Sequence, residues 1–167
     1  MDLDWTSVWE DDVADHAELA VVLARAFPRS RTIGGEQSWS SARPELRLVG
    51  RVAGQVVAHA AVLRRFVQVD GRAQLVGDVG LVAVDPARHG TGLGAALLTQ
   101  VREALCGLGM PFGFLTCGEQ VAGFYDPFAT KLYIADWLPL EMQRPALAHE
   151  IEHSLQDQHF DLKALMR

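Results

Sequence analysis

Residues 81–98 read LVAVDPARHGTGLGAALL, and their pattern is the most informative in the chain about its fold. A short apolar run ends at Asp85 and Pro86, glycines follow at every second position from Gly90, and an apolar helical pattern then begins. The order of strand, glycine-rich loop and helix predicts a site for anionic oxygens, because backbone N–H groups in such a loop are unobstructed. The first helical turn adds N–H groups without intrahelical acceptors and a partial positive charge. We therefore expect a pyrophosphate to bind here, and we call residues 89–95 the glycine loop.

The composition predicts one globular domain and excludes several functions. The chain has 167 residues, enough for a substantial core, and we expect a single domain over residues 1–167. The net charge of −6 argues against a nucleic-acid partner, since phosphate contacts need a basic surface. Two cysteines, Cys106 and Cys117, give no disulfide framework, and with an acidic N-terminus lacking an apolar secretion signal they favour a cytoplasmic protein. No apolar run approaches the length of about 18 residues that a membrane span needs.

The segments before the glycine loop predict one helix and several strands. A short strand is expected around Val8, and a helix from Asp11 or Asp12 to about Phe27. Its apolar face would carry Val13, Ala17, Ala20, Ala24 and Phe27. Residues 29–43 are polar and predict a loop, and strands are expected at residues 45–52, 55–69 and 72–84.

The segments after the glycine loop complete a layered fold. A helix is expected to about Cys106, with Leu93, Leu97, Val101 and Leu105 on its buried side, followed by a strand at residues 111–117. Gly77 and Gly80 within the third strand indicate a bulge or a close approach of another element. The fold class is therefore α/β, a mixed, mostly antiparallel central sheet flanked by helices, with an atypical helical C-terminus.

The glycine loop also matches a loose dinucleotide fingerprint, Gly90-x-Gly92-x-x-Ala95. In a dinucleotide-binding fold the strand runs almost directly into the first glycine, whereas residues 85–89 intervene here. Antiparallel strands also precede the loop, where a dinucleotide-binding unit would begin the domain. We therefore prefer a different pyrophosphate ligand.

The motif His89-Gly90-Thr91-Gly92-Leu93-Gly94 resembles the pattern of the GNAT acyltransferase superfamily. That pattern places Arg or Gln, two residues, Gly, one residue, and Gly or Ala; His89 departs from it, with Arg88 just before. Within the superfamily the chain is similar to the nodulation-factor N-acyltransferases over roughly residues 5–128. The matching segments are residues 15–19, 38–39, 42–47, 58–59, 63–66 and 111–114. Residues 58–62 also resemble the aminoglycoside 2′-N-acetyltransferases.

The resemblance implies an acetyl-CoA or longer acyl-CoA donor, and a small-molecule amine as acceptor. Backbone groups of Val82 and Val84, with Ala83 between them, would line the pantetheine arm. The pyrophosphate would bind to His89, Gly90, Thr91, Gly92, Leu93, Gly94 and Ala95. An acyl carrier protein offers only one phosphate and would use the loop differently. A homodimer is a further expectation.

Amine acylation needs a neutral amine and a proton for the leaving thiolate. Asp78 is the candidate base, with a hydrogen-bonded aspartate at the sheet end as the alternative. The resemblance implies that Tyr125 is the candidate acid, with a packed core tyrosine as the alternative. For His59 we expect a hydrogen-bonded core histidine rather than a ligand-facing one.

The tail at residues 128–167 departs from the core expected at residues 1–127. His149, Glu150 and His153 form an HExxH signature, in which two histidines one helical turn apart share a zinc ion and the glutamate acts as base. Residues 118–167 resemble the active-site segment of bacterial zinc-metallopeptidase-like proteins. We expect the zinc site to be incomplete, because Gln156 replaces the turning glycine before His159. A zinc hydrolase fragment and a non-catalytic coenzyme-binding module are thus alternatives to an acyltransferase.

Overall fold

The computed structural model describes residues 3–30, 33, 38–39, 42–69, 72–110 and 113–115. The chain divides into two compact units, residues 1–113 and 114–167, and nearly all described residues lie in the first. The expected boundary at residues 127 and 128 and the whole expected tail lie outside the described residues, so that division stays a prediction.

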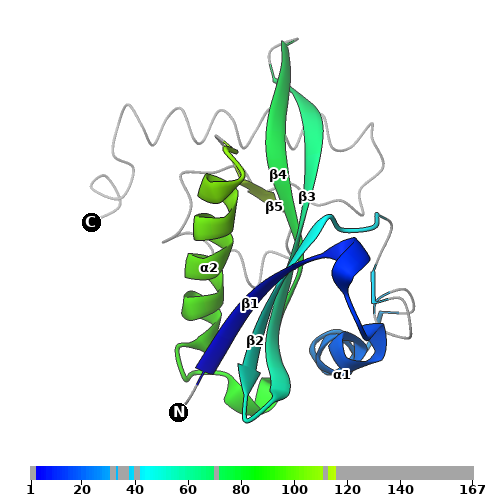
Figure 1. The fold of residues 1–167 in the computed structure, drawn as a ribbon, viewed down its shortest axis with the longest axis vertical. Helices are drawn as coiled ribbons and strands as arrows, with labels where there is room; N and C mark the ends of the chain where they lie inside the picture. The colour runs from blue at the N-terminus through cyan, green and yellow to red at the C-terminus, as the bar shows by residue number, and fades with distance from the viewer. Residues whose placement is uncertain are drawn as a thin grey trace, which may run out of the picture. The chain divides into compact units, whose positions relative to one another are not determined.

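The described strands form one sheet in the order β1-β2-β3-β4-β5 (Figure 1). Neighbouring strands from β1 to β4 pair antiparallel, as expected from the turns between them. The strand bounds are β1 Leu3–Trp9, β2 Leu46–Val52, β3 Gln55–Val69, β4 Arg72–Val84 and β5 Gly113–Leu115. The prediction of a mostly antiparallel sheet flanked by helices is confirmed.

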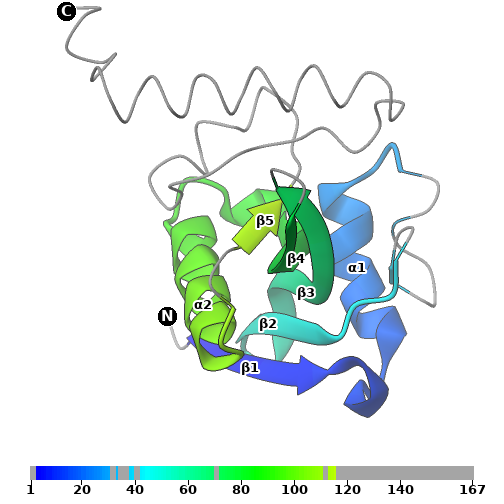
Figure 2. The ribbon, with the colours of Figure 1, turned by 90° about the horizontal axis from the view of Figure 1, so that it is seen from above.

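Two helices cover opposite faces of the sheet (Figure 2). Helix α1 (His16–Ala26) packs on β3 and β4 from one side, and α2 (Leu93–Gly107) packs on β2, β3 and β4 from the other. The helical side chains that fill the two interfaces are Leu19, Ala20, Val22 and Leu23 of α1, and Leu93, Leu97, Leu98 and Val101 of α2. The middle of β3 is buried on both of its faces, which explains its continuous apolar run.

The start of α1 differs from the prediction. Residues Glu10–Asp12 form a short 3₁₀ helix, η1, and α1 begins only at His16. Asp15 is the N-cap, because its side chain accepts a hydrogen bond of 2.8 Å from the Ala17 N–H. The predicted caps at Asp11 and Asp12 were therefore wrong, and of the expected apolar face only Ala20 belongs to the buried set.

Gly77 of β4 marks a close approach of α2, one of the two expected explanations for a glycine in this strand. A Cβ atom at Gly77 would lie 2.2 Å from the Leu105 Cδ2 atom. The same leucine would meet a Cβ at Gly113 of β5 at 2.7 Å. Leu105 therefore lies directly on the backbone of the sheet, which fixes the distance between α2 and β4.

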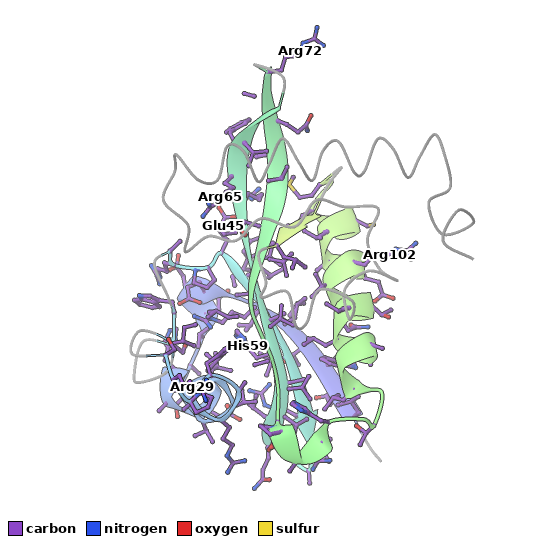
Figure 3. The ribbon with its side chains drawn as sticks, turned by 180° about the vertical axis from the view of Figure 1, so that it is seen from behind. Arg29, Glu45, His59, Arg65, Arg72 and Arg102 are labelled. Carbon is purple, nitrogen blue, oxygen red and sulfur yellow. The ribbon has the colours of Figure 1, made fainter. Side chains whose placement is uncertain are left out.

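β3 and β4 continue past the neighbouring strand as a two-stranded ribbon (Figure 1). The pairing of β2 with β3 ends at Leu46 and Val62, whereas β3 and β4 stay paired to Val69 and Arg72. Figure 3 shows Arg72 at the far end of this ribbon. Neither described α-helix is long and apolar enough to cross a membrane.

Candidate active site

The glycine loop is joined to β4 by a short 3₁₀ helix, η2 (Pro86–Arg88), whose N-cap is Asp85. One carboxylate oxygen of Asp85 accepts from the Ala87 N–H at 3.1 Å. The other oxygen accepts from the Arg25 guanidinium, in the last turn of α1, at 2.9 Å. Asp85 therefore fixes the start of the loop and connects it to α1.

Two glycines of the loop have backbone conformations that favour glycine. Gly90 has φ of 76° and Gly92 has φ of 82°, both in the left-handed region. No described atom lies within 4 Å of a Cβ built at either position. These positions thus combine left-handed turns with room for a ligand, as a phosphate-binding loop requires.

The N-terminus of α2 directly follows Gly92. The Ala96 N–H donates to the Gly92 carbonyl at 3.1 Å, which makes it the first hydrogen bond of the helix. The N–H groups of Leu93, Gly94 and Ala95 therefore have no acceptor inside the helix. Together with the helix dipole they suit a pyrophosphate. Residues 89–95, predicted to bind the pyrophosphate, thus form the turn into α2 and its first residues, and their contact with a donor stays a prediction.

The side chains at the start of the loop hold the loop itself. The His89 Nε2 atom lies 3.3 Å from the Val84 carbonyl oxygen, and since a carbonyl only accepts, Nε2 donates. The Thr91 hydroxyl donates to the Arg88 carbonyl at 2.7 Å. His89, where the GNAT pattern has Arg or Gln, is therefore turned back onto the end of β4.

β4 carries a bulge at Leu81 and Val82, between the predicted base Asp78 and the predicted donor-binding residues Ala83 and Val84. His59 pairs with Ala83 and Ala61 pairs with Gly80, so that Leu81 and Val82 both lie opposite Ala60. Leu81 has φ of 51°, a conformation that leucine rarely adopts. Such bulges are common beside active sites, where they redirect a strand.

A buried polar network lies on the α1 side of the sheet next to this bulge. Arg47 of β2 is fully buried, and its guanidinium binds both carboxylate oxygens of Glu10 in η1. The Nη1 atom of Arg47 donates to the Ser38 carbonyl at 3.1 Å and to His59 Nε2 at 3.0 Å. The charge of Arg47 is therefore compensated by Glu10, as a buried charge requires.

His59 connects this network to the bulge from the middle of the sheet (Figure 3). Its Nδ1 atom lies 2.9 Å from the Leu81 carbonyl oxygen, so Nδ1 carries the proton and Nε2 accepts from Arg47. Burial, opposed by the Leu81 hydrogen bond and reinforced by the Arg47 charge, lowers the pKa of His59 from 6.5 to about 3. His59 is thus a neutral, hydrogen-bonded core histidine, as expected.

Asp78 lies on β4 opposite Leu63, three residues before the bulge. Its Oδ2 atom binds the Arg65 Nε atom at 2.9 Å, and its side chain remains 22% exposed. The ion pair fixes the orientation of the Asp78 carboxylate. Glu45 forms an ion pair of 2.7 Å with Arg64, the residue that precedes Arg65 in β3.

Several predicted residues lie outside the described part of the chain: Cys117, Tyr125, His149, Glu150 and His153. The distance between Asp78 and Tyr125 is therefore untested, and the roles of both stay predictions. Among the described residues, no group of three or more His, Cys, Asp or Glu side chains could hold a metal ion.

The profile of one protein family, described as Nodulation protein A (NodA), matches residues 1–138. The chain belongs to the Nodulation protein A family. It is 40% identical over 119 residues to Nodulation protein A of Bradyrhizobium sp. (strain ANU 289), a match that covers 67% of this chain and 56% of the relative. The protein of the same name from Methylobacterium nodulans is 42% identical over 119 residues, with 67% and 55% covered. The chain thus spans a little over half the length of these relatives.

Solved structures place this member of the Nodulation protein A family in the GNAT fold. A GNAT family acetyltransferase from Brucella melitensis, solved in complex with acetyl-CoA, is 25% identical with a TM-score of 0.58, covering 77% of this chain and 82% of that one. Glucosamine-6-phosphate N-acetyltransferase from Arabidopsis thaliana shares the fold alone, at 13% identity and a TM-score of 0.61, covering 84% and 99%. The predicted resemblance to GNAT proteins and nodulation-factor enzymes is confirmed. The likeness of the tail to metallopeptidases stays a prediction, and residues 139–167 lie beyond the family match.

Sequence reasoning missed the Glu10–Arg47–His59 network of this Nodulation protein A family member. The signal was the presence of Arg47 and His59 inside otherwise apolar strands. Side chains of these two types are costly to bury unless they are paired. Their partner Glu10 is 37 residues from Arg47 in sequence. Nothing in the local pattern around Glu10 indicates this partnership.

Proposed function

We propose that the protein is a GNAT-type N-acyltransferase that moves an acetyl or longer acyl group from acyl-CoA directly to a primary amine. The observation that carries the proposal is the glycine loop at the N-terminus of α2, which the short helix η2 joins to a bulged β4. Membership of the Nodulation protein A family and the GNAT fold support it. A cytoplasmic location, which suits an acyl-CoA donor, and a homodimer are parts of the same proposal.

The donor would be bound mainly by backbone groups. The N–H groups at the start of α2 would bind the pyrophosphate oxygens, since Gly90 and Gly92 place no side chain in front of them. The pantetheine arm would lie along Val82, Ala83 and Val84. It would pair with the backbone of β4 there, as an additional strand would. An acyl carrier protein would place its single phosphate at the same N-terminus, so the shared chemistry is a phosphopantetheine thioester.

In the transfer step the amine nitrogen attacks the thioester carbonyl carbon. A C–N bond forms, the C–S bond breaks, the amine loses one proton and the thiolate gains one. Asp78 would accept the amine proton, directly or through a water, because its carboxylate is partly exposed on β4 just before the bulge. Tyr125 would donate a proton to the thiolate.

Release of the coenzyme A thiol tests this activity. Purified protein is incubated with acetyl-CoA or a long-chain acyl-CoA and a panel of primary amines that includes amino sugars. We expect thiol release that depends on both donor and amine. Coenzyme A binding without turnover of any acyl donor by any amine would contradict the proposal and favour the non-catalytic coenzyme-binding module.

Two conservative variants separate the proposed roles of the candidate acid and base. Asp78→Asn and Tyr125→Phe should each lower kcat by roughly 10²-fold and leave the Kd for coenzyme A unchanged, a typical loss for general acid–base catalysis. Glu45→Gln is the matched control, because Glu45 forms the neighbouring ion pair with Arg64 at a similar exposure. Glu45→Gln should keep kcat within about twofold. An Asp78→Asn variant that behaves like this control would remove Asp78 from the mechanism.

A further inference from the structure

Leu81 is held in a strained backbone conformation at the bulge of β4. Its φ of 51° lies in the left-handed region, where a leucine Cβ crowds the neighbouring carbonyl. No glycine or asparagine stands at this position to make the conformation easy. Such conformations persist only where the surroundings hold them in place, and they gather at functional sites.

Two contacts hold Leu81. Its side chain packs against a small cluster of Val22, Leu23 and Ala83 between α1 and the sheet. Its carbonyl oxygen accepts the hydrogen bond from His59 Nδ1 at 2.9 Å. The packing of this partly buried side chain does not fix the peptide group, whereas the hydrogen bond acts on the peptide group itself.

His59 is fixed in turn by groups from other elements. Its Nε2 atom accepts from Arg47 of β2 at 3.0 Å, and Arg47 is bound by Glu10 of η1 and by the Ser38 carbonyl. Arg47 and His59 are fully buried, and Glu10 is 5% exposed. The ring therefore has one orientation and one tautomer, with its single N–H aimed at Leu81.

The Leu81 carbonyl belongs to the same peptide unit as the Val82 N–H. In a trans peptide the C=O and N–H bonds point in opposite directions, and no described peptide bond is cis. The hydrogen bond from His59 therefore turns the Val82 N–H away from the polar network. Val82 is also the first of the three residues proposed to line the donor's pantetheine arm.

We infer that His59 is a positioning residue, which acts through the Leu81–Val82 peptide to aim the Val82 N–H at the thioester end of the donor. Glu10 and Arg47 set the orientation of His59. This inference rests on the proposed acyl-transfer function for its catalytic consequence, but not for the backbone geometry. A preset N–H group of this kind stabilises negative charge that develops on a carbonyl oxygen during attack.

Two amide variants separate the hydrogen bonds of His59. In His59→Asn the amide nitrogen takes the place of Nδ1, so the bond to Leu81 is kept and the bond to Arg47 is lost. In His59→Gln the longer amide reaches the place of Nε2, so the bond to Arg47 is kept and the bond to Leu81 is lost. Both variants remove the ring and match each other in polarity, so a general packing defect affects them alike.

We expect H59Q to lower kcat by tenfold or more with an unchanged Kd for coenzyme A, and H59N to keep kcat within about threefold. Turnover is measured below the melting temperature of each variant and corrected for the folded fraction. A role in stability alone would lower the two melting temperatures and leave both corrected kcat values near that of the wild type. That result, or any result in which H59Q keeps at least as much kcat as H59N, would overturn the inference.

A second readout is independent of turnover. The three-bond coupling between the Leu81 amide and α protons, measured by NMR on labelled protein, depends on φ. It should move toward values of an ordinary extended strand in H59Q and stay at the wild-type value in H59N; the same coupling in both variants would contradict the inference. If the two variants show this pattern but the wild type transfers no acyl group from any donor, the proposed function fails and the positioning role of His59 remains.

Discussion

The guanidinium of Arg25 binds the carboxylate of Asp85 at 2.9 Å and so joins the last turn of α1 to the first residue of the turn that leads into the glycine loop. Asp85 is only 13% exposed, and its second oxygen caps η2. The loop is therefore supported from the α1 side of the sheet, whereas the helix that it opens lies on the opposite side (Figure 2).

Loss of this ion pair should weaken donor binding more than it weakens the fold. Arg25 is 59% exposed, and ion pairs of this kind contribute about 0–1 kcal/mol to stability. We expect Arg25→Met to raise the Kd for coenzyme A about threefold in calorimetric titration. The matched control is Arg51→Met, since Arg51 binds Glu18 of the same helix at 3.0 Å. Equal effects of the two variants on the Kd would show that Arg25 has no specific role in the loop.

The Arg47–Glu10 pair should be costly to break from one side. Arg47→Met leaves the carboxylate of Glu10 buried without its main partner, and such losses typically reach about 3–5 kcal/mol. The double variant Glu10→Gln/Arg47→Met should be more stable than Arg47→Met alone, because it no longer buries the charge. Urea unfolding of both variants measures the difference. A double variant less stable than Arg47→Met would mean that Glu10 also stabilises the fold in another way.

His59 should make the protein less stable in mild acid. Its pKa in the folded protein is about 3, against 6.5 for an ordinary histidine, so between these values the unfolded chain binds the extra proton. Stability therefore rises with pH in this window and is lost as the pH falls, by at most about 1.4 kcal/mol per pH unit from this group. Urea unfolding at pH 7, 6 and 5 should show that the free energy of unfolding falls more steeply with decreasing pH for the wild type than for His59→Asn. Equal slopes would mean that His59 titrates normally in the folded protein.

Gly77 and Gly80 should respond differently to alanine. A methyl group at Gly77 would meet Leu105 at 2.2 Å, and overpacking of this kind costs roughly 1–3 kcal/mol. At Gly80 no described atom lies within 4 Å of the added carbon, so Gly80→Ala should change stability by less than about 0.5 kcal/mol. Thermal unfolding of the two variants compares them directly. A Gly77→Ala variant as stable as Gly80→Ala would mean that Leu105 and α2 move aside without cost.

The sheet could be predicted well from the sequence. β3 and β4 have the bounds that the apolar runs at residues 55–69 and 72–84 predicted. The start of α1 could not be predicted from the sequence, because Asp11, Asp12 and Asp15 are all suitable caps. Only the folded chain decides that Asp15 accepts the hydrogen bond from the Ala17 N–H. The glycine loop was predicted because each of its requirements, a strand end, glycines and a helix start, is local.

The polar network and the bulge depend on contacts that are distant in sequence. Glu10, Ser38, Arg47 and His59 meet only through the register of β2 on β3 and the fold of η1. The glycines at positions 77 and 80 indicated an irregular β4, but they could not show that the strained residue is Leu81. Its conformation follows from the pairing with β3 and from His59, which no local pattern contains.

Calorimetric titration of coenzyme A into Gly92→Ala tests whether the glycine loop binds the pyrophosphate. Alanine is strained at φ of 82° and adds a methyl group in front of the N-terminus of α2. Gly109→Ala is the matched control, because Gly109 has φ of 66°, has no described atom within 4 Å of an added Cβ, and follows the opposite end of α2. Pantetheine, which lacks the pyrophosphate, is titrated into the same proteins.

We expect Gly92→Ala to weaken coenzyme A binding by about tenfold or more, equal to about 1.4 kcal/mol, and to leave the affinity for pantetheine unchanged. Gly109→Ala should bind both ligands as the wild type does. If Gly92→Ala binds coenzyme A with the affinity of Gly109→Ala, the glycine loop does not hold the pyrophosphate, and the account of this site is wrong.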